Sequence, residues 1–91
     1  MANTDWYQHI DLSGPLREAL QFVAEGKTDQ QIASQLAISL KTAKRHRKLL
    51  RRAFNSDSTA EMIAKATVLG FVNTDRIFAN DKPPIYADYD P

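Results

Sequence analysis

The sequence contains no cysteine, which excludes disulfide bridges and thiolate metal sites. Its two histidines, His9 and His46, have no further soft ligand beside them, so we expect no metal ion. No apolar run approaches the roughly 18 residues that a membrane-spanning helix needs, and the N-terminus lacks the basic and apolar regions of a signal peptide. We therefore expect a cytoplasmic protein.

Catalytic patterns are also missing. The three glycines form no phosphate-binding loop, and no nucleophile stands near a base in a recognisable motif. We therefore expect neither an enzyme nor a bound cofactor. The 91 residues, of which 43% are hydrophobic and 25% charged, fit one small globular domain.

Acidic residues are absent between Gln30 and Ser56, and seven of the twelve basic residues lie in that stretch. The rest of the chain holds five basic and eleven acidic residues, so the net charge of +1 hides a local basic patch. On a helix the seven charges occupy an arc of roughly 160°. They are Lys41, Lys44, Arg45, Arg47, Lys48, Arg51 and Arg52.

The opposite arc of this helix carries Leu49, Leu50, Phe54 and His46, which we expect to pack against a core. A basic helix face can simply be solvated. Seven like charges without interleaved acids repel one another, however, and this favours binding to a polyanion.

Four helices are predicted from apolar periodicity and from capping residues. Thr28 and Gln31 form a capping box, as do Ser58 and Glu61, while Ser39 is placed to cap the basic helix. A proline in the first turn and a following glycine bound the first helix. The predicted helices cover residues 15–25, 29–36, 40–54 and 59–69, so the fold class is all-α. Two helices joined by a tight turn, the second one basic, form a helix-turn-helix arrangement.

At these residues the chain resembles the LuxR/NarL (GerE-type) DNA-binding domain of bacterial transcription regulators. The resemblance covers residues 12–72, and its specific part runs from Gly26 to His46. The matching residues are Leu12-Ser13, Glu18-Ala19-Leu20, Phe22-Val23-Ala24-Glu25-Gly26, Thr28, Gln31-Ile32-Ala33, Leu36, Ile38-Ser39, Thr42-Ala43-Lys44-Arg45-His46, Ala66 and Gly70-Phe71.

The resemblance implies a four-helix bundle whose third helix, residues 40–54, reads the major groove of double-stranded DNA. By position it implies that Lys44, Arg45 and Lys48 contact bases, where lysine or arginine can bind guanine. The remaining polar groups would contact phosphates. These predicted phosphate contacts are Thr28, Lys41, Thr42, Arg47, Arg51 and Arg52.

Some positions depart from the family pattern. The arginine-glutamate pair near the start of the first helix is replaced by Pro15-Leu16, and the glycine after the recognition helix is Asn55. Because the lost arginine would anchor the bundle, we expect a difference in packing there. Residues 1–11 are too short for a sensor domain, so we expect no control by a receiver or ligand-sensing domain within this chain.

The helix at residues 59–69 is apolar almost all the way round, which predicts two burial partners: the core and a second subunit. We therefore predict a homodimer, in keeping with the resemblance. The alternative is that Trp6, Tyr7 or the C-terminal segment covers this helix. The predicted dimer residues are Met62, Ile63, Ala66 and Leu69.

A second reading of function is an interaction protein that pairs with a full-length LuxR-type regulator and antagonises or assists it. The domain prediction is an N-terminal extension at 1–11, a DNA-binding domain at 12–72 and an acidic, proline-containing tail at 73–91. The aspartates of this tail suggest an arm that shields the basic helix or recruits a partner; a flexible extension is the simpler reading.

Overall fold

The computed structural model describes residues 10–78. At Phe78 it describes the backbone only. The predicted arm around Pro83-Pro84 and the predicted cover by Trp6 and Tyr7 lie outside the described residues. All the regular structure within the described part is helical. Its helices are α1 (Gly14–Ala24), α2 (Asp29–Leu36), α3 (Leu40–Ala53), α4 (Thr59–Val68) and α5 (Thr74–Phe78).

The capping residues produce the helix boundaries much as predicted. In the Thr28–Gln31 capping box, the Thr28 hydroxyl accepts from the Gln31 N–H at 3.1 Å and the Gln31 side chain accepts from the Thr28 N–H at 2.8 Å. At the start of α3, the Ser39 hydroxyl accepts from the Thr42 N–H at 3.0 Å. Asn55 has φ 49°, so the residue after α3 adopts the left-handed conformation that ends a helix.

The cap of α4 differs in one detail from a capping box. The Ser58 hydroxyl accepts from the Glu61 N–H, but the Glu61 carboxylate accepts from the N–H of Asp57 rather than from that of Ser58. This backbone hydrogen bond, followed by the side-chain bond to Lys65, lowers the pKa of Glu61. The carboxylate is therefore held in its charged form at the positive end of α4.

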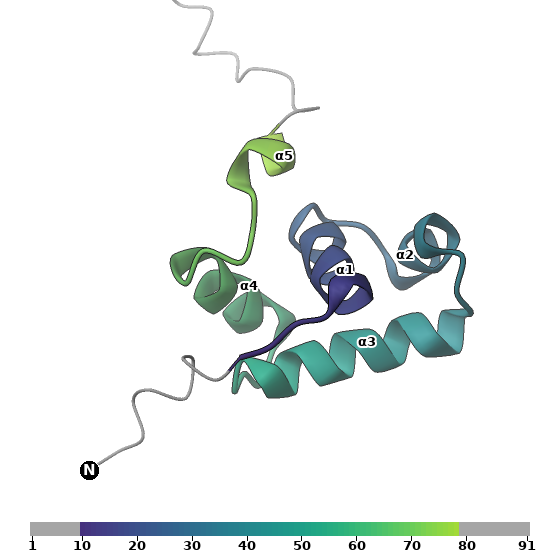
Figure 1. Ribbon diagram of the computed structural model, residues 1–91, viewed down its shortest axis with the longest axis horizontal. Coiled ribbons are helices and arrows are strands. Elements are labelled where there is room, and N and C mark those ends of the chain that lie inside the picture. Colours follow the sequence, from purple (N-terminus) through teal and green to yellow (C-terminus); the bar gives the residue numbers. More distant parts are fainter. Residues whose placement is uncertain (1–9, 79–91) are drawn as a thin grey trace, which may run out of the picture.

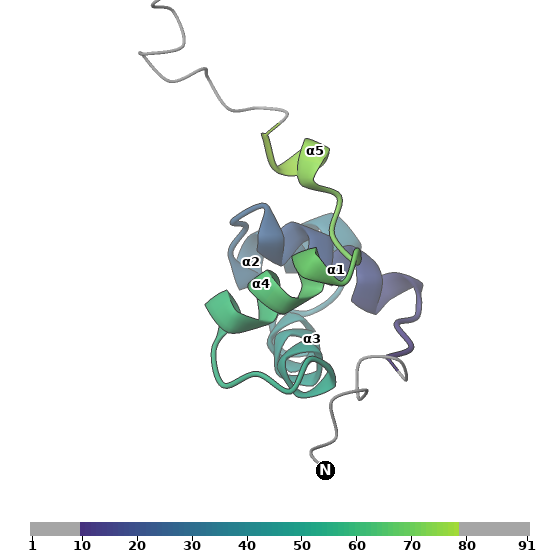
Figure 2. The same cartoon turned by 90° about the vertical axis from the view of Figure 1, so that its left-hand side faces the viewer.

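The helices enclose one core to which α1, α2, α3 and α4 all contribute. Phe54, directly after α3, is fully buried and meets Phe71 edge to face, with ring centroids 5.4 Å apart. α3 runs along one side of the molecule, with α1, α2 and α4 packed on its inner face (Figures 1 and 2). The largest fully buried side chains are Leu20, Ile32, Leu50, Phe54 and Met62.

One short helix was not predicted. α5 begins at Thr74, inside the segment expected to be a tail, and lies at the end of the molecule away from α3 (Figures 1 and 2). No helix within residues 10–78 is both long and apolar enough to span a membrane.

Candidate nucleic-acid interface

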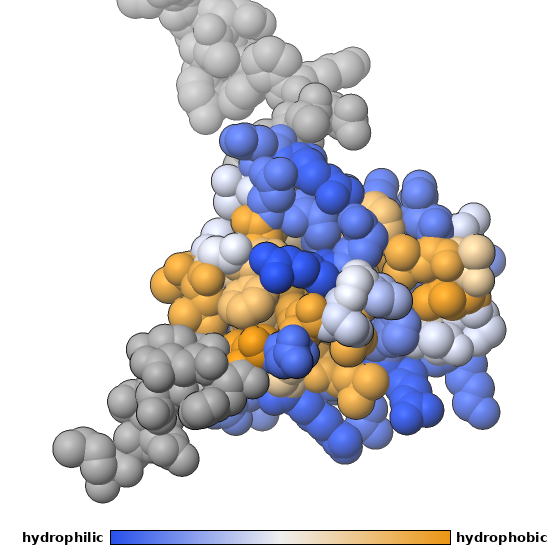
Figure 3. Space-filling model, viewed as in Figure 1, coloured by the Kyte–Doolittle hydropathy of each residue, from blue (hydrophilic) through white to orange (hydrophobic). Residues whose placement is uncertain are grey.

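The outward side of α3 carries a shallow groove lined by cationic side chains. We call it the basic groove, and its lining residues are Lys41, Lys44, Arg45, Lys48, Leu49 and Arg52. All six are exposed. Hydrophilic side chains project along the edge of the molecule that α3 forms (Figure 3).

The three predicted base-contacting residues, Lys44, Arg45 and Lys48, line this groove together. Within residues 10–78, no carboxylate lies within ion-pair distance of any of them. Lys41 and Arg52, two of the predicted phosphate contacts, are likewise exposed in the groove without an acidic partner in the described part of the chain. Their positive charge is therefore not neutralised within the domain, and it faces solvent.

The two threonines predicted to touch phosphate already form hydrogen bonds at the starts of α2 and α3. Thr28 caps α2, and the Thr42 hydroxyl accepts a hydrogen bond from the Ser39 hydroxyl at 2.9 Å. Both side chains stay at or near the surface. Their contact with phosphate remains a prediction.

Two of the predicted phosphate contacts turn out to face the protein. Arg47 Nε donates to Asp29 Oδ1 at 2.7 Å, and its Nη1 lies 3.5 Å from the Thr59 hydroxyl. Arg51 Nη1 donates to the Asp57 carbonyl at 3.1 Å. These arginines lie at one end of the charged arc, beside the starts of α2 and α4, so they connect α3 to its neighbours. The ion pair with Asp29 gives Arg47 a role within the fold. Contact of Arg47 and Arg51 with phosphate stays a prediction.

The opposite end of the arc also differs from the prediction. Leu49, expected to join the core, is 37% exposed and lies in the basic groove. Leu50 and Phe54 are buried as expected, so the outward face of α3 is turned from Arg47 toward Leu49. His46 is half-buried, and its buried Nδ1 has no hydrogen-bond partner within the described residues.

The predicted dimer surface needs a correction at two residues. Met62 and Ala66 are fully buried in the core of their own chain, so neither is available to a second subunit. Ile63 and Leu69 are half-buried against that core. Val68 was not among the predicted dimer residues, yet it is 85% exposed. Which apolar residues of α4 face inward could not be known without the position of the core.

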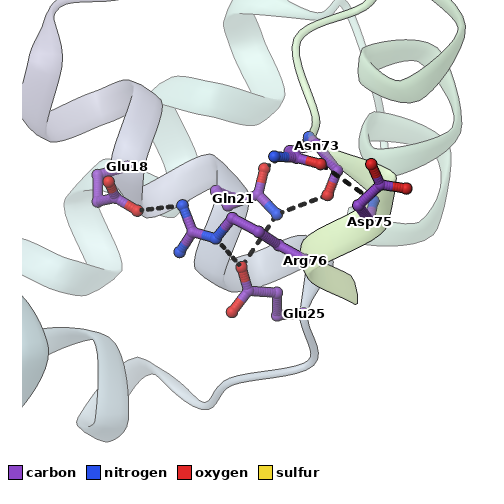
Figure 4. Close-up of polar contacts among 6 residues, drawn as sticks. All are labelled: Glu18, Gln21, Glu25, Asn73, Asp75 and Arg76. Atoms are coloured by element: carbon purple, nitrogen blue, oxygen red, sulfur yellow. Dashed lines mark hydrogen bonds and ion pairs between the residues drawn. The ribbon is translucent and has the colours of Figure 1, made fainter. Parts of the chain in front are cut away.

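A polar network joins α5 to α1, and sequence reasoning missed it (Figure 4). Gln21 is only 5% exposed; its amide nitrogen donates to the Asn73 carbonyl at 3.0 Å and its amide oxygen accepts from the Asn73 N–H at 2.7 Å. Arg76 forms ion pairs with Glu18 at 3.2 Å and with Glu25 at 3.1 Å. The only signal in the sequence was a glutamine among the apolar positions of α1.

The described residues contain no group of three or more histidine or acidic side chains that could hold a metal ion. The basic groove presents five exposed cationic side chains to solvent. A model of the GerE family, described as bacterial regulatory proteins of the luxR family, matches residues 12–66. Neither a curated protein nor a solved structure matches the chain.

Proposed function

This chain belongs to the luxR family of bacterial regulatory proteins, whose helix-turn-helix domain binds DNA, and we propose that it recognises a specific double-stranded sequence through the basic groove. The observation that carries the proposal is the set of five exposed cations on one side of α3. Because they lack acidic partners in the described part of the chain, binding a polyanion breaks no ion pair of the domain. Release of counterions from the phosphates then favours association.

Within this proposal the contacts with DNA are of two kinds, to bases and to phosphates. Lys44, Arg45 and Lys48 would donate hydrogen bonds to base edges, because lysine and arginine match the acceptors of guanine in the major groove. Phosphate contacts would fix the position of α3 without reading sequence. They fall to Lys41 and Arg52 at the groove, to Arg51, to Thr28 at the N-cap of α2 and to Thr42 in the first turn of α3.

We further propose that the protein acts as a homodimer through α4. One support is an apolar area over this helix (Figure 3). Another is the exposure of its side chains: Val68 is 85% exposed, and Ile63 and Leu69 are half-buried. A two-fold dimer would place two copies of α3 in successive major grooves about 34 Å apart and would favour a palindromic site.

Single substitutions test the division of the groove. Lys44→Ala or Lys48→Ala should weaken binding by about 1–3 kcal/mol and relax preference at one base position. Arg52→Ala should weaken all sequences similarly and lower the salt slope by about one. Arg17→Ala is the control, because Arg17 is an exposed cation in the groove between α1 and α5, which no residue of α3 lines. Identical effects of Lys48→Ala and Arg52→Ala would contradict the division.

The second candidate is an interaction protein that pairs through α4 with a full-length LuxR-type regulator and antagonises or assists it. The exposure of Val68 favours a protein contact of some kind at this helix. Sedimentation and DNA titration of the isolated protein distinguish the two candidates. Tight DNA binding by a homo-oligomer supports the regulator, whereas a monomer that ignores DNA but captures a LuxR-type relative supports the interaction protein.

A further inference from the structure

The basic groove contains one residue that carries no charge and forms no hydrogen bond through its side chain. Leu49 is 37% exposed and is surrounded by Lys41, Lys44, Arg45, Lys48 and Arg52 along the groove. It is not one of the buried residues of the core. Its exposed part faces the groove and not the core.

The charges around Leu49 determine what can cover it. Five cations border the side chain, so an apolar protein surface placed there would have to desolvate them without supplying a counter-charge. Duplex DNA supplies both parts, because its phosphates neutralise the cations while α3 lies in the major groove. An apolar side chain in that groove finds one apolar feature among the base edges, the C5-methyl group of thymine.

The position of Leu49 along the helix fits such a contact. It follows Arg45 by four residues and Lys48 by one, which places it about 6 Å beyond Arg45 along the axis on the same exposed side. It is thus within about two base pairs of the groups proposed to bind guanine.

We propose that Leu49 is a specificity-determining residue that selects thymine by packing on its C5-methyl group. This inference rests on the proposed function, since it requires α3 to enter the major groove. It adds an apolar contact to a surface otherwise built of hydrogen-bond donors. The preferred half-site then contains a thymine close to the guanine bound by Arg45 or Lys48.

The test uses uracil, which lacks only this methyl group. A duplex is first selected from a random library with the wild-type protein, and each thymine of the selected site is then replaced singly by uracil. At one position in each half-site, wild-type protein should bind the uracil duplex about fourfold more weakly, the factor expected for one buried carbon group. Leu49→Ala should bind the thymine and uracil duplexes equally well.

Leu40→Ala is the matched control. Leu40 is the other exposed leucine of α3, at 43%, and it does not line the basic groove. Neither leucine is among the buried residues of the core, and alanine favours a helix at least as strongly, so both variants should fold. Leu40→Ala should keep the fourfold penalty for uracil.

The possible results distinguish a failure of the thymine contact from a failure of the proposed DNA binding. Selection of no sequence at all would overturn the proposed function and this inference with it. A selected site at which wild-type protein binds uracil as well as thymine at every position would overturn the thymine contact alone. A uracil penalty that persists unchanged in Leu49→Ala would also overturn it, since another side chain would then contact the methyl group.

Discussion

Replacing Arg47 with alanine should destabilise the fold while leaving the electrostatics of DNA binding nearly unchanged. The Arg47 Nε–Asp29 Oδ1 distance is 2.7 Å, and both side chains are 25% exposed. A fully exposed pair contributes about 0–1 kcal/mol, whereas a hydrogen bond to a charged group contributes about 1.5–3 kcal/mol. A partly buried pair lies between, so we expect a loss of about 1–2 kcal/mol in the free energy of unfolding.

Thermal denaturation by circular dichroism measures this loss. For a domain of this size about 1 kcal/mol lowers Tm by about 4–8 °C, so Arg47→Ala should melt roughly 5–15 °C lower. Asp29→Ala should have a similar effect, and the double variant should lose less than the sum of the two. The salt slope of DNA binding, measured well below the melting range, should not change. An unchanged Tm with a slope lower by about one would refute the reasoning and restore Arg47 as a phosphate contact.

Three further substitutions test other parts of the structure. Gln21→Leu removes the partner of the Asn73 backbone and should cost about 1 kcal/mol, with faster hydrogen exchange at the Asn73 amide; unchanged exchange would contradict the docking of α5. Phe54→Ala empties a fully buried site and should lower the unfolding free energy in urea by about 3–5 kcal/mol. Glu61 has a lowered pKa in the fold, so its contribution is present above its ordinary pKa and is lost as pH falls through the lowered value. Glu61→Gln should therefore flatten the acid side of a Tm–pH profile, and an unchanged profile would count against the Asp57 hydrogen bond.

Much of the fold could be predicted because its signals are local. Thr28 with Gln31, Ser39 and Ser58 fix the starts of three helices through hydrogen bonds within one turn. The all-helical class and the helix-turn-helix arrangement followed from these caps and from the apolar period. Asn55 took the left-handed conformation expected of it. Local rules work here because donor and acceptor are close in sequence.

What could not be predicted depends on contacts between distant residues. In the sequence, nothing distinguishes Arg47 from the other charges of the basic arc. Its ion pair with Asp29 depends on the packing of α2 against α3. Met62 looked available to a partner because the apolar residues of α4 surround the helix, and only the core shows which of them face inward. Likewise, nothing in the local sequence indicates that Arg76 meets Glu18, 58 residues away.

The sequence therefore predicted a cationic face on α3 but not the direction in which that face points. Lys44, Arg45 and Lys48 line the basic groove together. Compared with the predicted arc, the outward face of α3 is rotated, so that Leu49 lies in the groove and Arg47 pairs with Asp29 instead. A helical wheel gives relative angles only, whereas the direction of the core sets which angle points to solvent. The structure thus gives Arg47, a predicted phosphate contact, an ion pair within the fold, and it places Leu49, a predicted core residue, among the cations of the groove.

Selection of binding sites from a random duplex library, at about 50 and 200 mM salt, tests the central claim most directly. The wild-type protein should enrich a palindromic sequence at both salt concentrations, and the variant with Lys44→Ala and Lys48→Ala should not. Weak binding that collapses at the higher salt and enriches no sequence would contradict the claim, because the groove would then contact phosphates alone.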